Sequence, residues 1–183
     1  MTEYNLYPLL REHVVSDHPT SYLEIGVQDG HSLKTVLKAD VTRRIERVAL
    51  CDNWGTSYGG TGKGNHQHIH NVLKSVDYQG AVEFYDGDSK KTVPTIPGYF
   101  DLILVDGDHS MDGCRIDMEN SWKILKENGS MVIDDIIHPD HKYLLQVVSN
   151  FIGKKSNDIL HVQYCTKELN GVIVIKKKED KNG

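Results

Sequence analysis

The sequence has few of the features that mark secreted, membrane or nucleic-acid-binding proteins. Its 183 residues include three cysteines, which lie far apart and form no CxxC pair. This argues against a disulfide framework and a zinc site and is typical of a reducing compartment. No apolar run approaches the ~18 residues needed to cross a bilayer, and residues 1–16 lack the apolar core of a signal peptide. We therefore expect a cytoplasmic protein without a membrane partner.

An excess of positive charge is also absent. The formal net charge is −5 and the isoelectric point is near 6.0, which gives no sign of a nucleic-acid partner. Three lysines at 176–178 are followed by two acidic residues, which indicates a solvated tail at 177–183. Because no repeat or linker is visible, the length predicts a single domain, 1–183, with its core at about 20–176.

Short apolar runs alternate with segments of helical periodicity. One stripe is typical of a helix that ends near Asn128-Gly129, and it consists of Cys114, Met118, Trp122 and Leu125. Strand–helix alternation predicts an α/β fold with a doubly wound, mostly parallel sheet. The last two runs are too close for a helical crossover and should form an antiparallel hairpin. The seven predicted strands are 21–25, 48–51, 81–85, 100–105, 130–133, 159–164 and 172–175.

The first predicted strand leads into a turn with two glycines. The turn reads Glu24-Ile-Gly26-Val-Gln28-Asp-Gly30, and its glycines let a ligand approach backbone N–H groups at the next helix. It is not the dinucleotide motif GxGxxG, because Gln28 takes the place of the second glycine. Glu24 lies near the end of a buried strand, which costs free energy unless it holds a cationic group. A plain strand–helix connector is the alternative.

Acidic residues also follow the second and third predicted strands. Asp52 ends the second strand 22 residues after Gly30, the usual place of a carboxylate that binds vicinal ribose hydroxyls. The alternative for Asp52 is a helix cap or a turn aspartate. Asp88, which Ser89 follows, could receive the amino group of a nucleobase, or it could cap a turn.

The most informative residues follow the fourth and fifth predicted strands. These strands end in Asp106-Gly-Asp-His109 and Asp134-Asp135, and neighbouring strands lie about 4.8 Å apart. Three converging carboxylates with no basic residue nearby in sequence would repel one another unless they hold a cation. All-oxygen ligation favours Mg²⁺, Ca²⁺ or Mn²⁺ over zinc. His109 follows at the edge of this site and is suited to a general base. The alternative is that Asp108 and Asp135 cap turns.

Segment 53–65 is rich in glycine. It is not a P-loop, because a glycine follows Gly62-Lys63 where Ser or Thr is required. The segment also follows the second strand and not the first. It is either a lid over the substrate or a flexible connection.

Histidines occur in two groups, one before the third predicted strand and one after the fifth. His66, His68 and His70 would scatter around a helix, which disfavours a shared metal site. His138 and His141 could line an acceptor pocket, but we expect a solvent-exposed pair at the entry to a helix.

On these residues the chain resembles the class I S-adenosylmethionine-dependent methyltransferases. Within that class it is similar to the metal-dependent O-methyltransferases of the macrocin and catechol type. The resemblance covers about 22–175 and is carried by Leu23–Gly30, Asp106–His109 and the pair Asp134-Asp135. Catechol-type enzymes have Asp-Asn at this pair, so the match is better to the macrocin type. The chain lacks the long N-terminal region that could close over a substrate.

The resemblance implies a Rossmann-like sheet of order 3-2-1-4-5-7-6 and a set of site residues. For S-adenosylmethionine it implies Glu24, Gly26 and Gly30 at the methionine part, Asp52 at the ribose, and Asp88 and Ser89 at the adenine. For a divalent cation, with Mg²⁺ favoured, it implies Asp106, Asp134 and Asp135, and for the general base it implies His109.

The predicted function is metal-assisted transfer of a methyl group to a hydroxyl of a small molecule. The resemblance favours a sugar or polyol acceptor and leaves a phenolic one open. One alternative is an NAD(P)-dependent oxidoreductase, which Gln28 and the predicted hairpin disfavour. Another is a non-catalytic module of the same fold, which the complete acidic and histidine set disfavours. A homo-oligomer in which a neighbouring subunit completes the pocket is a further hypothesis.

Overall fold

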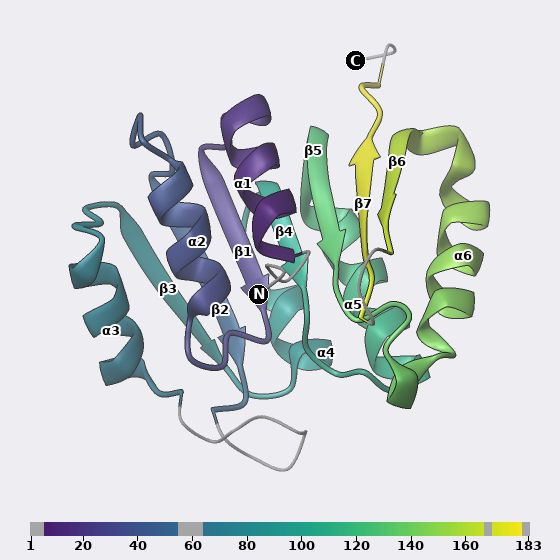
Figure 1. Ribbon diagram of the computed structural model, residues 1–183, viewed down its shortest axis with the longest axis horizontal. Coiled ribbons are helices and arrows are strands. Elements are labelled where there is room, and N and C mark those ends of the chain that lie inside the picture. Colours follow the sequence, from purple (N-terminus) through teal and green to yellow (C-terminus); the bar gives the residue numbers. More distant parts are fainter. Residues whose placement is uncertain (1–5, 55–63, 167–169, 181–183) are drawn as a thin grey trace.

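The computed structural model describes residues 6–54, 64–166 and 170–180 (Figure 1). One seven-stranded sheet has the order β3-β2-β1-β4-β5-β7-β6. β7 runs antiparallel to β5 and β6, and the other pairs are parallel. The predicted fold class and strand order are therefore confirmed. The strands are β1 (Ser21–Ile25), β2 (Arg47–Asp52), β3 (Ala81–Asp86), β4 (Phe100–Val105), β5 (Leu125–Ile133), β6 (Ile159–Cys165) and β7 (Val172–Lys177).

Helices cover both faces of the sheet. In Figure 1, α1, α2 and α3 lie in front of the sheet and α5 lies behind it. No helix among the described residues is long and apolar enough to cross a membrane. The helices are α1 (Leu6–Asp17), α2 (His31–Ala39), α3 (His66–Ser75), α4 (Ser89–Thr92), α5 (Met111–Ile124) and α6 (Leu144–Lys155). Three 3₁₀ turns are η1 (Val93–Thr95), η2 (Pro139–His141) and η3 (Ser156–Asp158).

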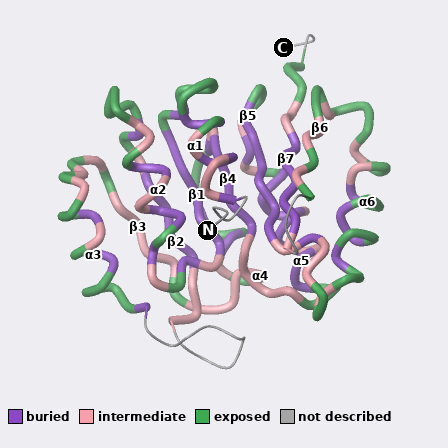
Figure 2. Tube along the Cα trace, viewed as in Figure 1, coloured by how far each residue is buried: buried purple, intermediate pink, exposed green. Residues whose placement is uncertain are grey.

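Strand alternation divides the core into two apolar clusters. Leu23 and Ile25 of β1 pack in the cluster that α5 and α6 cover, whereas Tyr22 packs in the cluster under α1 and α2. The central strands are buried along nearly their whole length, while the outer sides of the helices are exposed (Figure 2). This double coverage is why the strands read as continuous apolar runs. Because both faces of the sheet are covered, polar functional side chains are expected at the ends of the strands.

The helix that was expected to end near Asn128-Gly129 ends earlier. α5 stops at Ile124, and Leu125 is already extended (φ −79°, ψ 127°) and pairs with Phe100 of β4. Asn128 has a left-handed backbone (φ 59°) within β5. The prediction of the end was wrong because the glycine signal marks a turn inside the strand and not the helix terminus.

The first helix and the last strand are more tightly packed than the sequence indicated. α1 buries Leu6, Leu9 and Leu10 in the core, although no helix was predicted there. The lysine run is not a solvated tail at its start, because β7 extends to Lys177. The Lys177 ammonium donates to the backbone oxygens of Trp122 and Leu125. Residues 181–183 of the predicted tail lie outside the described residues.

The last residue of α1 ties that helix to the sheet. Asp17 accepts hydrogen bonds from Ser130 of β5 (3.0 Å) and Lys176 of β7 (2.8 Å), and it pairs with His13 (3.2 Å). Partial burial would raise the pKa of Asp17, but the bonds from His13, Lys176 and Ser130 outweigh it and hold that pKa well below its usual value. The ionised carboxylate therefore stabilises the fold.

We expect Asp17→Asn to lower the free energy of unfolding by about 1–2 kcal/mol at pH 7. Because the folded-state pKa is depressed, this difference is complete above about pH 4 and shrinks as the pH falls through the folded-state value. Urea unfolding at pH 7 and pH 3 measures it. Glu12→Gln, an exposed change on the same helix, is the control. An Asp17→Asn variant as stable as the parent at pH 7 would contradict the assignment.

Candidate active site

A cavity of ≈ 740 Å³ opens at the carboxyl ends of β1, β2 and β4, and its volume suits a ligand the size of a nucleoside derivative. This is where the strand order reverses around β1. Of the residues predicted for the site, those on the cavity wall are Gly26, Asp52, Asp88, Ser89, Asp106, His109, Asp134 and Asp135. Wall residues that the sequence did not single out include Leu6, Tyr7, Trp54 and Lys90.

The glycine turn works through a close backbone approach. Gly26 has a left-handed backbone (φ 86°), and a Cβ there would lie 2.0 Å from the carbonyl oxygen of Asp106. Only glycine fits at this position. Gly30 (φ 74°) serves packing, because its Cβ would meet Ile69 of α3 at 2.9 Å, and it is not on the cavity wall. Gly26 is therefore on the cavity wall and Gly30 is not, and the ligand contacts predicted for both stay predictions.

Glu24 also stays away from the cavity wall. It lies on the face of β1 under α1 and α2, is 1% exposed, and accepts a hydrogen bond from the Tyr22 hydroxyl at 2.9 Å. Burial raises the pKa of Glu24 well above its usual value, which favours the neutral form of the carboxyl. The expected contact with a cationic group has no support in this geometry, because strand alternation turns the side chain into the core.

Asp52 organises the turn around the cavity. Its Oδ2 accepts from the backbone N–H groups of Val27 (2.7 Å) and Gln28 (2.8 Å), and its Oδ1 accepts from that of Trp54 (2.6 Å). The turn-aspartate alternative is thus present in the structure. The side chain also lines the cavity, so contact with ribose hydroxyls stays a prediction.

Asp88 and Ser89 begin the short helix α4 beside the cavity. Asp88 caps this helix, accepting from the N–H of Lys90 at 3.0 Å. The Lys90 ammonium reaches Asp88 (3.3 Å) and Asp108 (2.7 Å), joining the loops after β3 and β4. Lys90 is therefore close in space to Asp108, although the two residues are 18 positions apart in sequence.

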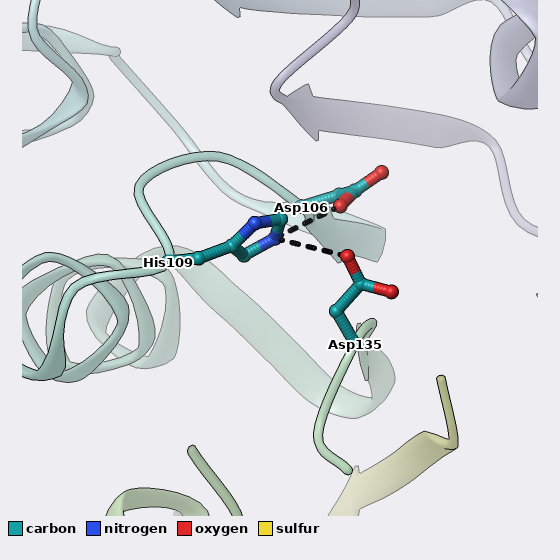
Figure 3. A group of neighbouring side chains, drawn as sticks. All are labelled: Asp106, His109 and Asp135. Atoms are coloured by element: carbon teal, nitrogen blue, oxygen red, sulfur yellow. Dashed lines mark ion pairs between the residues drawn. The ribbon is translucent and has the colours of Figure 1, made fainter. Parts of the chain in front are cut away.

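Three side chains converge after β4 and β5 (Figure 3). His109 Nε2 lies 3.3 Å from Asp106 Oδ1 and 3.7 Å from Asp135 Oδ2. One possible ligand atom from each residue lies within 4.8 Å of the other two. Asp135 has a left-handed backbone (φ 56°), a strained conformation for an aspartate, and this turns its carboxylate toward the other two. The predicted convergence of Asp106 and Asp135 is present, with His109 between them.

Asp134 does not join this group. Its side chain is 2% exposed and lies on the cavity wall, but its carboxylate is outside the set formed by Asp106, His109 and Asp135. Successive residues at a strand end point in different directions, which the sequence spacing could not show. The structure thus groups two of the three predicted aspartates with His109, and metal binding by all three stays a prediction.

The charges of the group act on one another. Burial raises the pKa of Asp106, and the neighbouring imidazole opposes that shift. Burial would lower the pKa of His109, but Asp106 and then Asp135 outweigh it, so the pKa of the imidazole is raised. Without another cation nearby, the group therefore favours a protonated imidazole between carboxylates.

Histidines beyond the fifth strand complete one side of the cavity. His138 and His141 both lie on the wall, which corrects the expectation of a solvent-exposed pair. The ring of His141 lies 5.1 Å from that of His109 and 5.3 Å from that of His138. The Tyr143 hydroxyl donates to the backbone oxygen of His109 at 2.9 Å and fixes the loop that carries this residue.

The three alternating histidines of α3 have different hydrogen-bond partners, while the rings of His66 and His70 both stack on Phe84. His66 binds Asp86 (2.8 Å), His68 contacts the backbone oxygen of Asp29 (3.0 Å), and His70 contacts that of His66 (2.7 Å). The glycine-rich segment 53–65 before this helix was interpreted as a lid or a connection. Its residues 55–63 lie outside the described part of the chain.

A further carboxylate lies beneath the cavity. Asp117 of α5 is 0% exposed, and neither of its oxygens has a hydrogen-bond partner. Burial raises the pKa of Asp117 to about 6, against the opposing effects of Ser89 and Lys90. The sequence analysis missed it, although an aspartate beside Cys114 and Met118 interrupts an apolar helix stripe and was a visible signal.

Comparisons with known proteins were made for sequence and structure. The family model described as "Methyltransferase domain" matches residues 23–136. A search of curated protein sequences found no match.

Several solved structures have the same fold. The O-methyltransferase TomG of Streptomyces achromogenes, in complex with SAM, is 18% identical with a TM-score of 0.72, over 98% of this chain and 82% of that one. An O-methyltransferase of Bacillus cereus in complex with SAH is 16% identical with a TM-score of 0.67, over 97% and 83%. The N-methyltransferase NodS of Bradyrhizobium japonicum WM9 is 14% identical with a TM-score of 0.63, over 94% of both chains. At these identities the likeness shows the fold.

We expect Asp117→Asn to raise the free energy of unfolding by about 1–3 kcal/mol at pH 7.5. The folded-state pKa of Asp117 is raised, so its ionisation opposes folding, and this cost is absent below about pH 4 and complete above about pH 6. Chemical denaturation at pH 4 and pH 7.5 should therefore show a gain at the higher pH. Asp112→Asn on the same helix, whose side chain is 85% exposed, is the matched control. A gain of equal size at both values would contradict the explanation.

Proposed function

Because the chain belongs to the methyltransferase-domain family, we propose that it transfers the methyl group of S-adenosylmethionine to a hydroxyl of a small molecule. One observation carries the choice of chemistry, namely the convergence of Asp106, His109 and Asp135 on one wall of the cavity at the sheet's switch point. Structures of the same fold include TomG, described as an O-methyltransferase in complex with SAM.

The charge of the cavity suits this donor. S-adenosylmethionine carries a cationic sulfonium and an ammonium group, and acidic walls attract both. The wall carboxylates belong to Asp29, Asp52, Asp88, Asp106, Asp108, Asp134 and Asp135, whereas Lys90 is its one lysine or arginine among the described residues. We place the methionine part at Gly26, the ribose at Asp52, and the adenine at Asp88 and Ser89. Glu24 and Gly30 are not on the cavity wall: Glu24 accepts a hydrogen bond from Tyr22, and Gly30 packs against Ile69.

The residues present fit a divalent cation. Asp106 and Asp135 offer carboxylate oxygens and His109 an imidazole nitrogen, all close enough to share one ion. Mg²⁺ and Mn²⁺ accept oxygen ligands, and Mn²⁺ also accepts imidazole. We propose that Asp106 and Asp135 hold the ion, with Asp134 behind them. When bound, such an ion lowers the pKa of an acceptor hydroxyl.

His109 is the proposed base. Its imidazole faces the cavity, and its loop is fixed by the Tyr143 hydroxyl. Asp106 and Asp135 keep the pKa of the imidazole raised. A cation that neutralised their charge would lower this pKa, so that the imidazole could accept a proton. His109 then takes the acceptor's proton as the methyl group is transferred in line, and the walls supply alignment.

The proposed methyl acceptor is a small hydroxylated molecule, which binds near His138, His141 and Tyr143. All three cysteines are free thiols, which agrees with a reducing, cytoplasmic setting. Burial raises the pKa of Cys51 to about 12, so this cavity thiol is not a nucleophile. A homo-oligomer stays a proposal.

We expect His109→Ala to lower kcat by about 100-fold or more, because a positioned base contributes about 10²–10⁴. The affinity for S-adenosylhomocysteine should change less than about threefold, since the imidazole is not among the proposed contacts of this ligand. Methyl-transfer assays across hydroxylated acceptors and calorimetry measure the two quantities. His161→Ala, an exposed change on β6, is the control. Normal turnover in His109→Ala would overturn the base assignment.

We also expect the chain to bind Mn²⁺ or Mg²⁺ at one site. Calorimetry on chelator-treated protein should show binding that Asp135→Asn weakens by about tenfold or more, because a ligand is lost. Asp140→Asn, whose side chain is 82% exposed, is the control. Full methyl transfer in excess EDTA, or equal binding by the Asp135 variant, would remove the ion from this site.

A further inference from the structure

A second, smaller cavity has no part in the proposed methyl transfer. Its volume is ≈ 300 Å³, and it lies where α1 packs on α2, in front of the sheet in Figure 1. We call it the basic groove, and its lining residues are Arg11 of α1 and His31, Lys34, Thr35, Lys38 and Ala39 of α2.

The basic groove has the opposite charge to the large cavity beside it. Among the described residues, three of its six lining residues are Lys or Arg and none is Asp or Glu, whereas aspartates dominate the wall of the large cavity. His31 lines both cavities, and its Nε2 lies 3.2 Å from Asp29 Oδ2, so this ion pair marks their boundary. The net charge of the chain is −5, so the positive groove is a local feature and not a result of composition.

The two lysines of the groove repel each other. Lys34 and Lys38 are four residues apart on α2, a spacing that places them on one face of the helix and at which like charges are destabilising. Within the described part of the chain, neither ammonium group has a hydrogen bond or an ion pair. The helix dipole favours Lys38, which lies in the last turn, but it does not explain Lys34. An anion shared by the two ammonium groups would remove the repulsion.

The opposite side of the groove suits a phosphate group. Arg11 comes from α1, so it faces the lysine pair from a different helix. A guanidinium presents N–H donors in a planar fork that matches the oxygens of a phosphate. The volume of ≈ 300 Å³ is about ten times the ~30 Å³ that one water occupies in the liquid, which leaves room for two linked phosphate groups.

We propose that the basic groove binds a diphosphate group, with Arg11 on one side and Lys34 and Lys38 on the other. The site is separate from the methyl-donor cavity and does not depend on the use of S-adenosylmethionine. Either free pyrophosphate or the diphosphate of a nucleotide supplies this chemistry.

Calorimetry with pyrophosphate and with inorganic phosphate tests the site. The protein should be treated with chelator and kept without divalent cations, so that no anion binds through an ion at Asp106 and Asp135. We expect pyrophosphate to bind about tenfold more tightly than phosphate, because only the diphosphate reaches both sides of the groove. Uridine diphosphate distinguishes the two sources, since tighter binding than that of pyrophosphate indicates a nucleotide and equal binding indicates the free anion.

Variants of the groove separate its two sides. Lys34→Gln and Lys38→Gln should each weaken pyrophosphate binding by about three- to fivefold, as expected for the loss of one exposed ion pair. Arg11→Gln should reduce the preference for pyrophosphate over phosphate to about threefold or less, because the second phosphate group loses its partner.

The matched control is Lys74→Gln. Lys74 is exposed and lies in the last turn of α3, as Lys38 does in α2, and the substitution changes the net charge by the same amount. Because Lys74 is outside the groove, its charge is screened from a ligand there. Its removal should change pyrophosphate binding by less than about 1.5-fold.

Three results would overturn the inference. One is equal binding of pyrophosphate and phosphate by the parent, and another is unchanged pyrophosphate binding in both lysine variants. The third is an equal loss in Lys74→Gln, because the effect would then be a general attraction between charges. None of these measurements involves the methyl donor, so their results do not depend on the proposed function.

Discussion

The site depends on the backbone contact between the turns after β1 and β4. The N–H of Asp106 donates to the carbonyl of Ile25 at 2.9 Å, and Gly26 passes so close to the Asp106 carbonyl that a Cβ could not be accommodated. These strands are neighbours because the order of the sheet reverses at β1. The chain leaves them toward opposite faces, so a crevice must open between the two turns. This contact fixes the two turns relative to each other, and the side chains that line the cavity extend from these turns and their neighbours.

The aspartates around the crevice have three different structural roles. Asp52 holds three backbone amides and shapes the turn, Asp88 caps a helix, and Asp106 with Asp135 faces a histidine across open space. Backbone N–H groups bind the first two, whereas the last pair lies on either side of an imidazole. Two carboxylates that face one such group favour the approach of a cation.

Backbone strain gathers at the same place. Gln28, Trp54 and Asp135 all have left-handed backbones, and all three line the cavity. Each conformation costs roughly 1–3 kcal/mol, so the surrounding contacts must hold it. Asp52 does this for Trp54 and Gln28 through its bonds to their N–H groups. The buried carboxylate of Asp117 beneath the cavity also lowers the free energy of unfolding. Residues around a functional site often lower the stability of a protein in this way.

The sequence by itself determined the sheet, its hairpin, and the strand ends at which polar residues gather, because burial on both faces leaves a pattern of apolar runs that local reading detects. It also brought Asp106, His109 and Asp135 to one edge. Only the tertiary structure decided that Glu24 turns into the core, that Asp134 is not grouped with Asp106, His109 and Asp135, and that Lys90 reaches Asp108. The direction of a side chain at a strand end depends on the backbone conformation of the turn and on partners that are distant in the sequence. The spacing of residues along the sequence reveals neither of these.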